Sequence, residues 1–288
     1  MKEADKKQVD IVRVAVFTAD TEALLTSPRN DSDLMFFHSK LNLHNFTFFN
    51  LVNKDVMNYI WTEVNGEIKS SNFTSCYVDY LRNLIKSIPT LENMWSDGCS
   101  YQNKCSILAS ALLTFAVKNN VRITQKYLVV GHTHMECDSV HASIEARLKH
   151  IDINLPIDYI NVIKTARMRP SRYGVKYLEY DFFRDYKEVC DIKSLRPPKE
   201  DDSHPVVTQI RQICYETDGS MSYNLSYSGD TWQKYPNNLN LRLLDAKQLY
   251  QTVNKISYTK WSHLQAIKVT TPKDCHHFYD NLEHHSKQ

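Results

Sequence analysis

Two consecutive stretches decide the fold: WSDGCSYQNKCSILASALLTFAVKNN at residues 95–120 and QKYLVVGHTHMECDSVHASIEARL at residues 125–148. Each begins with a short apolar run, continues through polar residues and ends with the apolar spacing of a helix. The expected elements are a strand over residues 93–95, a helix over 103–117, a strand over 126–130 and a helix over 137–148. Such strand-then-helix units indicate an α/β sheet, with polar residues gathered at the carboxyl ends of its strands.

The segment before these units predicts three strands and one helix. Residues 9–16 are a β-branched run that ends near Asp20, and residues 43–52 and 56–63 are aromatic-rich runs that predict a pair of strands. Residues 73–88 have apolar side chains at helical spacing. The order is therefore β-β-β-α-β-α-β-α, which is typical of the RNase H-like fold, a mixed sheet with helices on both faces.

The character of the chain changes after residue 183. The segment SLRPPKEDDSHP is rich in proline and charge, and the segment that follows it predicts a β-hairpin around Asp218-Gly219. We therefore expect an RNase H-like domain over residues 1–193, a linker or loop over 194–205 and a small C-terminal region with β structure over 206–288.

The composition is that of an ordinary globular protein, with 42% hydrophobic and 24% charged residues among 288. A formal net charge of +2 gives no sign of a polyanionic partner. Seven cysteines without a C-x-x-C pair favour reduced thiols over a disulfide framework or a zinc module. Because neither a signal peptide nor a membrane-spanning run is found, an intracellular location, nuclear or cytoplasmic, is expected.

Three acids fall at strand ends of this fold: Asp20, Asp97 and Asp138. Phosphoryl transfer by two metal ions needs several converging carboxylates, because hard oxygens bind Mg²⁺ and the metals hold the attacking and the leaving oxygen. Each acid alone is better explained as a helix cap or a turn residue. Three of them in the right elements of one fold favour a metal site.

The third acidic position has competitors in the last predicted helix. Glu136, Asp138 and Glu145 are all candidates. Asp138, His141 and Glu145 are spaced i, i+3 and i+7, so they share one face of that helix. Glu145 is equally well explained as a charge that faces solvent.

Polar residues near these acids are candidates for supporting roles. His132 and His134 follow a predicted strand, and His134 is interpreted as a group that orients a phosphate or a metal-bound water. Neither has a partner at zinc spacing. Gln102 and Asn103 open the helix that follows Asp97. There they would contact the carboxylates or a nucleic-acid backbone, or cap the helix.

The segment ARMRPSRYGVKYL at residues 166–178 interleaves basic and aromatic side chains. Its basic residues are Arg167, Arg169, Arg172 and Lys176. This pattern suits a surface that follows a nucleic-acid backbone and stacks bases, and a solvated surface segment is the alternative.

The motifs SDGC-x-x-QN and GHT-x-M-E-x-DSVH-x-x-IE, together with AVFTADTEALLTSP and GVKYLEYDFF, resemble those of a eukaryotic domain-of-unknown-function family found in transposon-derived open reading frames. Members of that family resemble RNase H-like DDE/D transposase or integrase catalytic domains. The resemblance covers most of the chain. It implies metal-dependent cleavage or strand transfer of DNA, with Mg²⁺ or Mn²⁺ as cofactor and DNA as partner.

The resemblance assigns roles to residues of this sequence. Asp20 matches the first-strand aspartate, eight residues before a proline, and Asp97 matches the aspartate of SDGC. His134 and Asp138 match the GHT-x-x-x-x-D element. The family pattern around the first acid resembles FDLQ, whereas this chain reads TADTE, which makes Glu22 an alternative to Asp20.

Two other functions fit the same residues. A catalytically inactive, domesticated or truncated transposase remnant, acting as a nucleic-acid-binding or interaction protein, is favoured by the altered first motif and the near-neutral charge. It is also favoured because we see no N-terminal DNA-binding module of the kind that longer relatives carry. A nuclease for RNA or hybrid duplexes would use the same acids. An oligomer is compatible with each reading.

Overall fold

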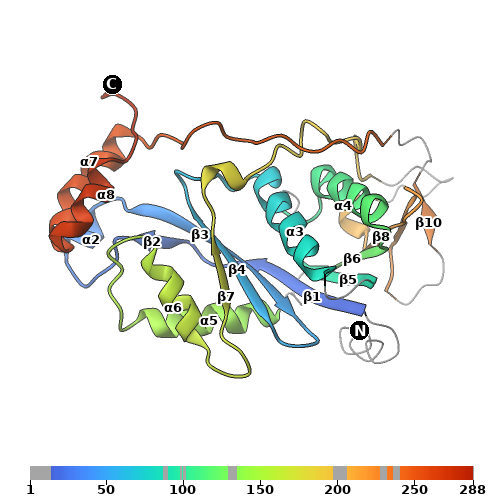
Figure 1. Ribbon diagram of the computed structural model, residues 1–288, viewed down its shortest axis with the longest axis horizontal. Helices are drawn as coiled ribbons and strands as arrows, with labels where there is room; N and C mark the ends of the chain where they lie inside the picture. The colour runs from blue at the N-terminus through green and yellow to red at the C-terminus, as the bar shows by residue number, and fades with distance from the viewer. Residues whose placement is uncertain are drawn as a thin grey trace.

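The computed structural model describes residues 14–86, 90–97, 99, 102–128, 135–196, 206–227, 232–235 and 241–287. Within these residues the chain is a mixed α/β protein with one ten-stranded mixed sheet and seven α-helices (Figure 1). The strands are β1 (Val14–Thr21), β2 (Leu25–Ser27), β3 (Leu41–Asn50), β4 (Val56–Thr62), β5 (Thr90–Ser96), β6 (Ile123–Tyr127), β7 (Gly174–Tyr177), β8 (Gln212–Tyr215), β9 (Met221–Asn224) and β10 (Gln233–Lys234). The helices are α2 (Leu34–Phe37), α3 (Ser70–Leu84), α4 (Ser106–Asn119), α5 (Glu136–Leu148), α6 (Asp158–Ala166), α7 (Tyr258–Ile267) and α8 (His276–Asp280).

The strand order along the sheet is β10-β9-β8-β6-β5-β1-β3-β4-β7, and the short β2 pairs with the part of β3 that extends beyond β1. Strands β1, β3 and β4 are antiparallel neighbours, whereas β5 and β6 run parallel to β1 on its other side. The carboxyl ends of β1, β5 and β6 therefore meet at one edge of the sheet, where open α/β sheets place their ligands.

The elements predicted over the first half of the chain are present with shifted bounds. The strand expected at 126–130 is β6, which begins three residues earlier, and the helix expected at 103–117 is α4, which begins three residues later. Strand β2 and helix α2 were not predicted, because three and four residues are too few to give a periodic pattern.

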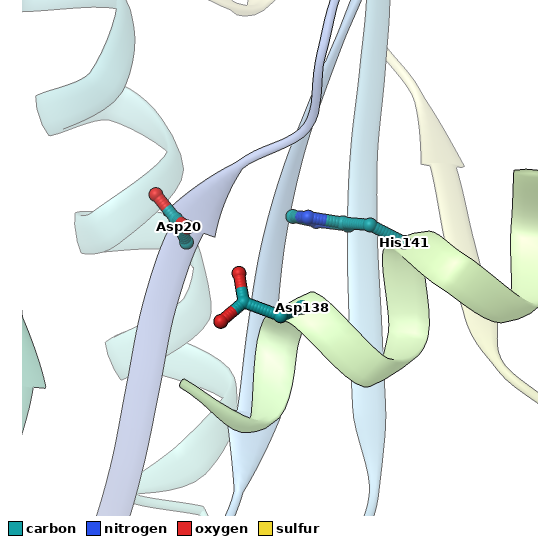
Figure 2. A group of neighbouring side chains, drawn as sticks. All are labelled: Asp20, Asp138 and His141. Atoms are coloured by element: carbon teal, nitrogen blue, oxygen red, sulfur yellow. The ribbon is translucent and has the colours of Figure 1, made fainter. Parts of the chain in front are cut away.

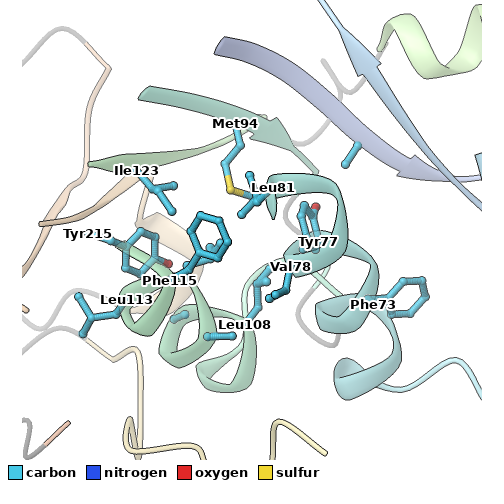
Figure 3. Packing of buried hydrophobic residues seen from close by; sticks show 14 of the residues in the cluster. Phe73, Tyr77, Val78, Leu81, Met94, Leu108, Leu113, Phe115, Ile123 and Tyr215 are labelled. Atoms are coloured by element: carbon cyan, nitrogen blue, oxygen red, sulfur yellow. The ribbon is translucent and has the colours of Figure 1, made fainter. Parts of the chain in front are cut away.

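An aromatic core lies between the sheet and the pair α3 and α4 (Figure 3). Phe46 and Phe48 alternate along β3 on this face, and both rings meet Tyr77 of α3 edge-on, with centroids 5.3 and 5.2 Å apart. Phe73 contacts Phe46 in the same way. Each buried aromatic side chain contributes about 1.5–3 kcal/mol through removal from water, so the aromatic-rich runs of the sequence serve to attach this helical layer.

The opposite face of the sheet carries α5 and α6 (Figure 1). Part of this face is polar. Thr18 of β1, Asn45 and Thr47 of β3, and Asn58 of β4 all point to this face, and each is 0% exposed. We refer to these four residues as the buried polar strip. Its hydrogen-bonding groups need partners inside the protein, since burying them without partners costs free energy.

The segment after residue 206 extends the same sheet. Strand β8 pairs antiparallel with β6, and the hairpin predicted around Asp218-Gly219 is present as β8–β9, with Gly219 at a φ of +83° in the turn. The buried Lys104 amine, whose pKa burial lowers to about 8, donates to the Ile210 carbonyl at 2.9 Å. This bond ties the start of α4 to the segment that enters β8.

The end of the chain packs far from this hairpin. Helices α7 and α8 form a small apolar cluster with Met35 and Leu41 beside α2 (Figure 1). Most of the linker expected at 194–205 lies outside the described residues. Within the described ranges, no helix is long and apolar enough to span a lipid bilayer.

The core between α4 and the sheet is tested by truncating Leu112, which is 0% exposed. We expect Leu112→Ala to lower the free energy of unfolding by about 2–5 kcal/mol, because the mutation leaves a cavity. The matched change Leu244→Ala, at a side chain 51% exposed, should alter it by less than about 0.5 kcal/mol. Denaturant titrations of the three proteins measure both effects, and equal losses at the two sites would contradict this packing.

Candidate metal centre

Three side chains converge at the carboxyl end of β1 (Figure 2). Asp20 comes from the end of that strand, and Asp138 and His141 come from the first two turns of α5. One potential ligand atom of each residue lies within 4.8 Å of the other two. Two carboxylates and an imidazole at this separation form a group that could hold one metal ion.

The start of α5 is held on the sheet by Cys137. Its thiol is buried, lying 3.4 Å from the Thr18 hydroxyl of β1 and donating to the Thr47 carbonyl of β3 at 3.5 Å. Because Cys137 is fixed between these two strands, the next turn of the helix carries Asp138 and His141 over the end of β1. Burial raises the pKa of this thiol to about 12, so it acts as a packing group.

Asp138 has a structural role as well. Its Oδ2 accepts a hydrogen bond from the Met135 backbone N–H at 2.7 Å, at the start of α5. A carboxylate at this end of a helix is also favoured by the helix dipole. The sequence left two interpretations of Asp138, a helix cap or a site residue, and the two are compatible. Asp138 caps its helix and also lies within the group formed with Asp20 and His141.

The Asp20 carboxyl is ionised with difficulty in this environment. Burial raises its pKa from 3.8 to about 7, a hydrogen bond from the Thr21 N–H opposes the rise, and the negative charges of Asp97 and Asp138 add to it. A cation among these carboxylates would remove the repulsion and favour the ionised form. The donor set and its electrostatics thus fit a divalent metal ion.

Asp97 lies beside the three-residue group. It follows β5, and its Oδ1 accepts hydrogen bonds from Asn103 Nδ2 at 2.6 Å and from the Cys99 N–H at 3.1 Å. The Asn103 amide is oriented by Tyr77, whose hydroxyl donates to Oδ1 at 2.7 Å. The charge of Asp97 acts on Asp20, although Asp97 supplies no atom to the 4.8 Å group.

Gln102 connects the two strands that end at the site. Its side-chain amide is buried and donates to the Thr21 hydroxyl, next to Asp20. Together with Asn103, it makes the QN pair of the sequence motif a support for the carboxylates. Neither residue caps α4, whose N-cap is Cys105.

His141 is neutral at physiological pH. Burial lowers the pKa of its imidazole to about 4, although the charge of Asp138 opposes this. Its Nε2 lies 3.0 Å from the Thr47 hydroxyl of the buried polar strip. Its helical spacing from Asp138 predicted only a supporting role for this residue, whereas the structure brings it into the potential ligand group.

The other predicted site residues lie outside this group. His134 and His132 fall in residues 129–134, outside the described part of the chain. Glu136 is the half-buried first residue of α5, and Glu145 is exposed further along the same helix. A separate buried acid, Glu22, accepts from Asn45 Nδ2 at 2.7 Å.

The predicted nucleic-acid contacts lie near β7, on the far side of β3 and β4 from β1. The Arg167 guanidinium donates to the carbonyls of Ser171 and Lys54, and Lys176 forms a 2.9 Å ion pair with Asp79. Arg169 and Arg172 are exposed, whereas the aromatic Tyr173 is buried and contacts Arg167. These contacts give two of the four cations partners within the chain.

Glu22 is a second buried acid, and folding makes its carboxyl group harder to ionise. It is 5% exposed, and burial raises its pKa from 4.5 to about 7, against the hydrogen bond from Asn45, while the charge of Glu145 adds to the rise. Its Oε1 has no hydrogen-bond partner among the described residues. The sequence offered Glu22 as an alternative to Asp20, but within the described residues it is not part of the three-residue group.

Replacing Glu22 with glutamine tests this burial. A raised carboxyl pKa favours folding while the group is protonated, so the contribution is complete below about pH 4.5 and is lost as the pH rises through about 7. That shift corresponds to roughly 3 kcal/mol. Between about pH 4.5 and 8, the unfolding free energy of the wild type should fall relative to Glu22→Gln by this amount.

Denaturant titrations in the presence of a chelator measure the difference, and Glu283→Gln, at an exposed carboxylate, serves as control. It should follow the wild type at every pH. If the Glu22→Gln curve also runs parallel to the wild-type curve, Glu22 ionises as easily in the folded protein as in the unfolded chain.

Comparison with known proteins gives a family match. Residues 39–204 match the family described as a domain of unknown function (DUF7869), which is more than half of the chain. The matched range includes Asp97, Asp138 and His141, whereas Asp20 precedes it. No curated protein and no solved structure matches the chain.

Proposed function

The chain belongs to the DUF7869 family, and we propose that it is a transposase-derived, RNase H-like protein. On this proposal it cleaves or transfers DNA phosphodiester bonds with divalent metal ions. The observation that carries this proposal is the convergence of Asp20, Asp138 and His141 at the carboxyl end of β1. The charge of Asp97, felt at Asp20, adds a third acid to the same region.

The arrangement of the sheet supports the RNase H-like part of the proposal. Three antiparallel strands lie in the order β1, β3 and β4, and the chain then adds β5 and β6 parallel to β1 on its other side. Helices α3 and α4 lie on one face and α5 on the other (Figure 1). This arrangement supports the proposal, because the β-β-β-α-β-α-β-α pattern of the sequence predicted a mixed sheet with helices on both faces.

The residues present suit Mg²⁺ or Mn²⁺. Carboxylate oxygens of Asp20 and Asp138 are the ligands that both ions prefer, and an imidazole nitrogen from His141 favours Mn²⁺ over the harder Mg²⁺. A bound ion would supply an activated water or 3′-hydroxyl and would stabilise the charge that develops on the phosphate. Two-ion chemistry would also need Asp97, together with phosphate oxygens of the substrate.

The chain's own contribution is to hold these groups in position before the substrate arrives. Tyr77 orients the Asn103 amide, which holds the Asp97 carboxylate, and Gln102 fixes the end of β1. Preorganised groups avoid reorganisation during the reaction, which is a main source of enzymatic rate enhancement. His134 stays a proposed orienting group, on the strength of the sequence motif alone.

A second function has its own support. Asp97 is engaged by Asn103 and by the Cys99 N–H and supplies no atom to the three-residue group. A protein with only Asp20, Asp138 and His141 at the centre would bind one metal ion and could have lost two-metal catalysis. The alternative is therefore an inactive transposase remnant that binds nucleic acid or other proteins.

Metal binding is tested by calorimetry with Mn²⁺ at about pH 8, where a carboxyl with a pKa near 7 is mostly ionised. We expect Asp20→Asn and Asp138→Asn to weaken binding by more than the roughly 10- to 100-fold that loss of an outer hydrogen-bond partner costs. The control Asp181→Asn, at an exposed carboxylate, should bind as the wild type does. Equal affinity in all four proteins would rule out this centre.

Catalysis is tested with labelled DNA duplexes in Mn²⁺, Mg²⁺ or Ca²⁺, beside RNA and RNA–DNA hybrid duplexes. The proposal predicts DNA cleavage in Mn²⁺ that is lost in Asp97→Asn, because removing that charge disables the second metal position. Cleavage of RNA or hybrids alone would change the substrate class. A wild type that binds Mn²⁺ and cuts none of these substrates would support the inactive remnant instead.

A further inference from the structure

A row of buried polar side chains leads away from His141 beneath α5. Thr47 is the register partner of Asp20 on β1 and of Asn58 on β4, so these three residues lie side by side across three strands. The Thr47 hydroxyl lies 3.0 Å from His141 Nε2 and 2.9 Å from Asn58 Oδ1. We call Thr47, Asn58 and Asn45 the buried relay.

The direction of the hydrogen bonds in the relay is fixed at Asn58. The backbone carbonyl of Gly174 lies 3.2 Å from this amide and can only accept, so the amide nitrogen must face Gly174. Asn58 Oδ1 therefore faces the relay. Asn45 confirms this orientation, because its Nδ2 donates to the same oxygen at 3.2 Å.

The direction then passes through Thr47 to the histidine. Asn58 Oδ1 cannot donate, so the single hydroxyl proton of Thr47 is used in the 2.9 Å bond to that oxygen. Toward His141 the Thr47 oxygen can only accept. His141 Nε2 must therefore carry a proton.

A neutral imidazole carries one proton, so a proton on Nε2 leaves the lone pair on Nδ1. We propose that the buried relay holds His141 in the Nε2–H tautomer, so that Nδ1 is the nitrogen that binds a divalent metal ion beside Asp20 and Asp138. Thr47 and Asn58 are then positioning residues that act through His141. The inference rests on the proposed function for the identity of the ligand, whereas the tautomer is a property of the metal-free chain.

Glu22 has a place in the same arrangement. Asn45 Nδ2 donates to Glu22 Oε2 at 2.7 Å as well as to Asn58 Oδ1. The carboxylate thereby holds the Asn45 amide with its nitrogen toward Asn58, which reinforces the direction of the relay. Metal-binding histidines commonly donate their second ring N–H to a fixed acceptor, which sets the tautomer and the ring orientation, and Thr47 supplies such an acceptor here.

A purely structural relay would satisfy the same buried groups without any effect on a metal, so the test must report on the nitrogen atoms. Long-range ¹H–¹⁵N correlation spectra of the metal-free, ¹⁵N-labelled chain distinguish protonated from unprotonated ring nitrogens. The His141→Gln spectrum identifies the His141 signals among the twelve histidines. We expect a protonated Nε2 and an unprotonated Nδ1, and the reverse pattern in the wild type would overturn the proposal.

Two variants at position 47 separate the hydroxyl from the shape of the side chain. Thr47→Val removes the acceptor and should release the single tautomer, and it should weaken Mn²⁺ binding by about 10- to 100-fold. Thr47→Ser keeps the hydroxyl and should retain both the tautomer and most of the affinity. If valine and serine give the same affinity and the same His141 signals, Thr47 does not position the ring. Because the wild-type spectrum is decisive by itself, a misfolded valine variant does not remove the test.

Titration with Zn²⁺, a diamagnetic probe, then identifies the binding atom. Only the His141 signals are read, so ions held by other histidines do not affect the result. A shift at Nδ1 supports the relay, and a shift at Nε2 overturns it.

If the wild type has the Nε2–H tautomer but no ion reaches His141, the metal part of the inference fails together with the proposed function, and the tautomer assignment stands. If an ion binds through Nε2, the metal centre stands and the relay fails.

Discussion

The candidate site depends on the contact of one buried thiol with two strands. Cys137 lies against the Thr18 hydroxyl of β1 and the Thr47 carbonyl of β3, and this fixes where α5 begins over the sheet. A shift of the helix by one residue would turn its side chains by about 100° and carry Asp138 and His141 away from Asp20. The same contact keeps the helix close to the buried polar strip, whose Thr47 hydroxyl lies 3.0 Å from His141 Nε2. Packing and site geometry are therefore set by the same residue.

The second constraint is the concentration of buried acidic side chains beneath α5. Asp20 and Glu22 follow each other at alternate positions at the end of β1, and burial raises the pKa of both carboxyls to about 7. The formal net charge of +2 for the whole chain hides this local excess of acid. Without a counter-charge, the folded state is less stable at high pH, which gives a divalent ion a thermodynamic reason to bind. Stability and metal binding are thus expected to be coupled in this protein.

Local patterns in the sequence were sufficient for the longer strands and helices from β1 to α5, and for two of the three converging residues. A few residues are enough to mark the end of a strand or the start of a helix. Asp20 and Asp138 lie at such positions and were therefore predicted as site residues. His141 was seen only as sharing a helix face with Asp138, because spacing along a helix does not reveal what that face contacts. The residues of β8 to β10 were predicted to belong to a small C-terminal region, because the sequence pattern of a strand does not show which other strand it pairs with. In the structure these strands extend the sheet at β6.

The buried relay could not have been read from the sequence for a related reason. Thr47 and Asn58 lie in aromatic-rich strands, where an isolated polar residue suggests a solvent-facing position. Their meeting with Asp20 depends on the register of three strands, and register is set by packing and turns across tens of residues. The direction of each hydrogen bond depends further on the Gly174 carbonyl of β7. Such a network is a property of the assembled sheet.

The most direct test of the central claim is anomalous X-ray diffraction from crystals of the chain soaked in Mn²⁺ at about pH 8, above the raised pKa of Asp20. The account predicts an anomalous peak within bonding distance of carboxylate oxygens of Asp20 and Asp138 and of His141 Nδ1. The control crystal of Asp138→Asn should lose that peak. A peak found only elsewhere in the wild type, or none under these conditions, would contradict the metal centre on which the account rests.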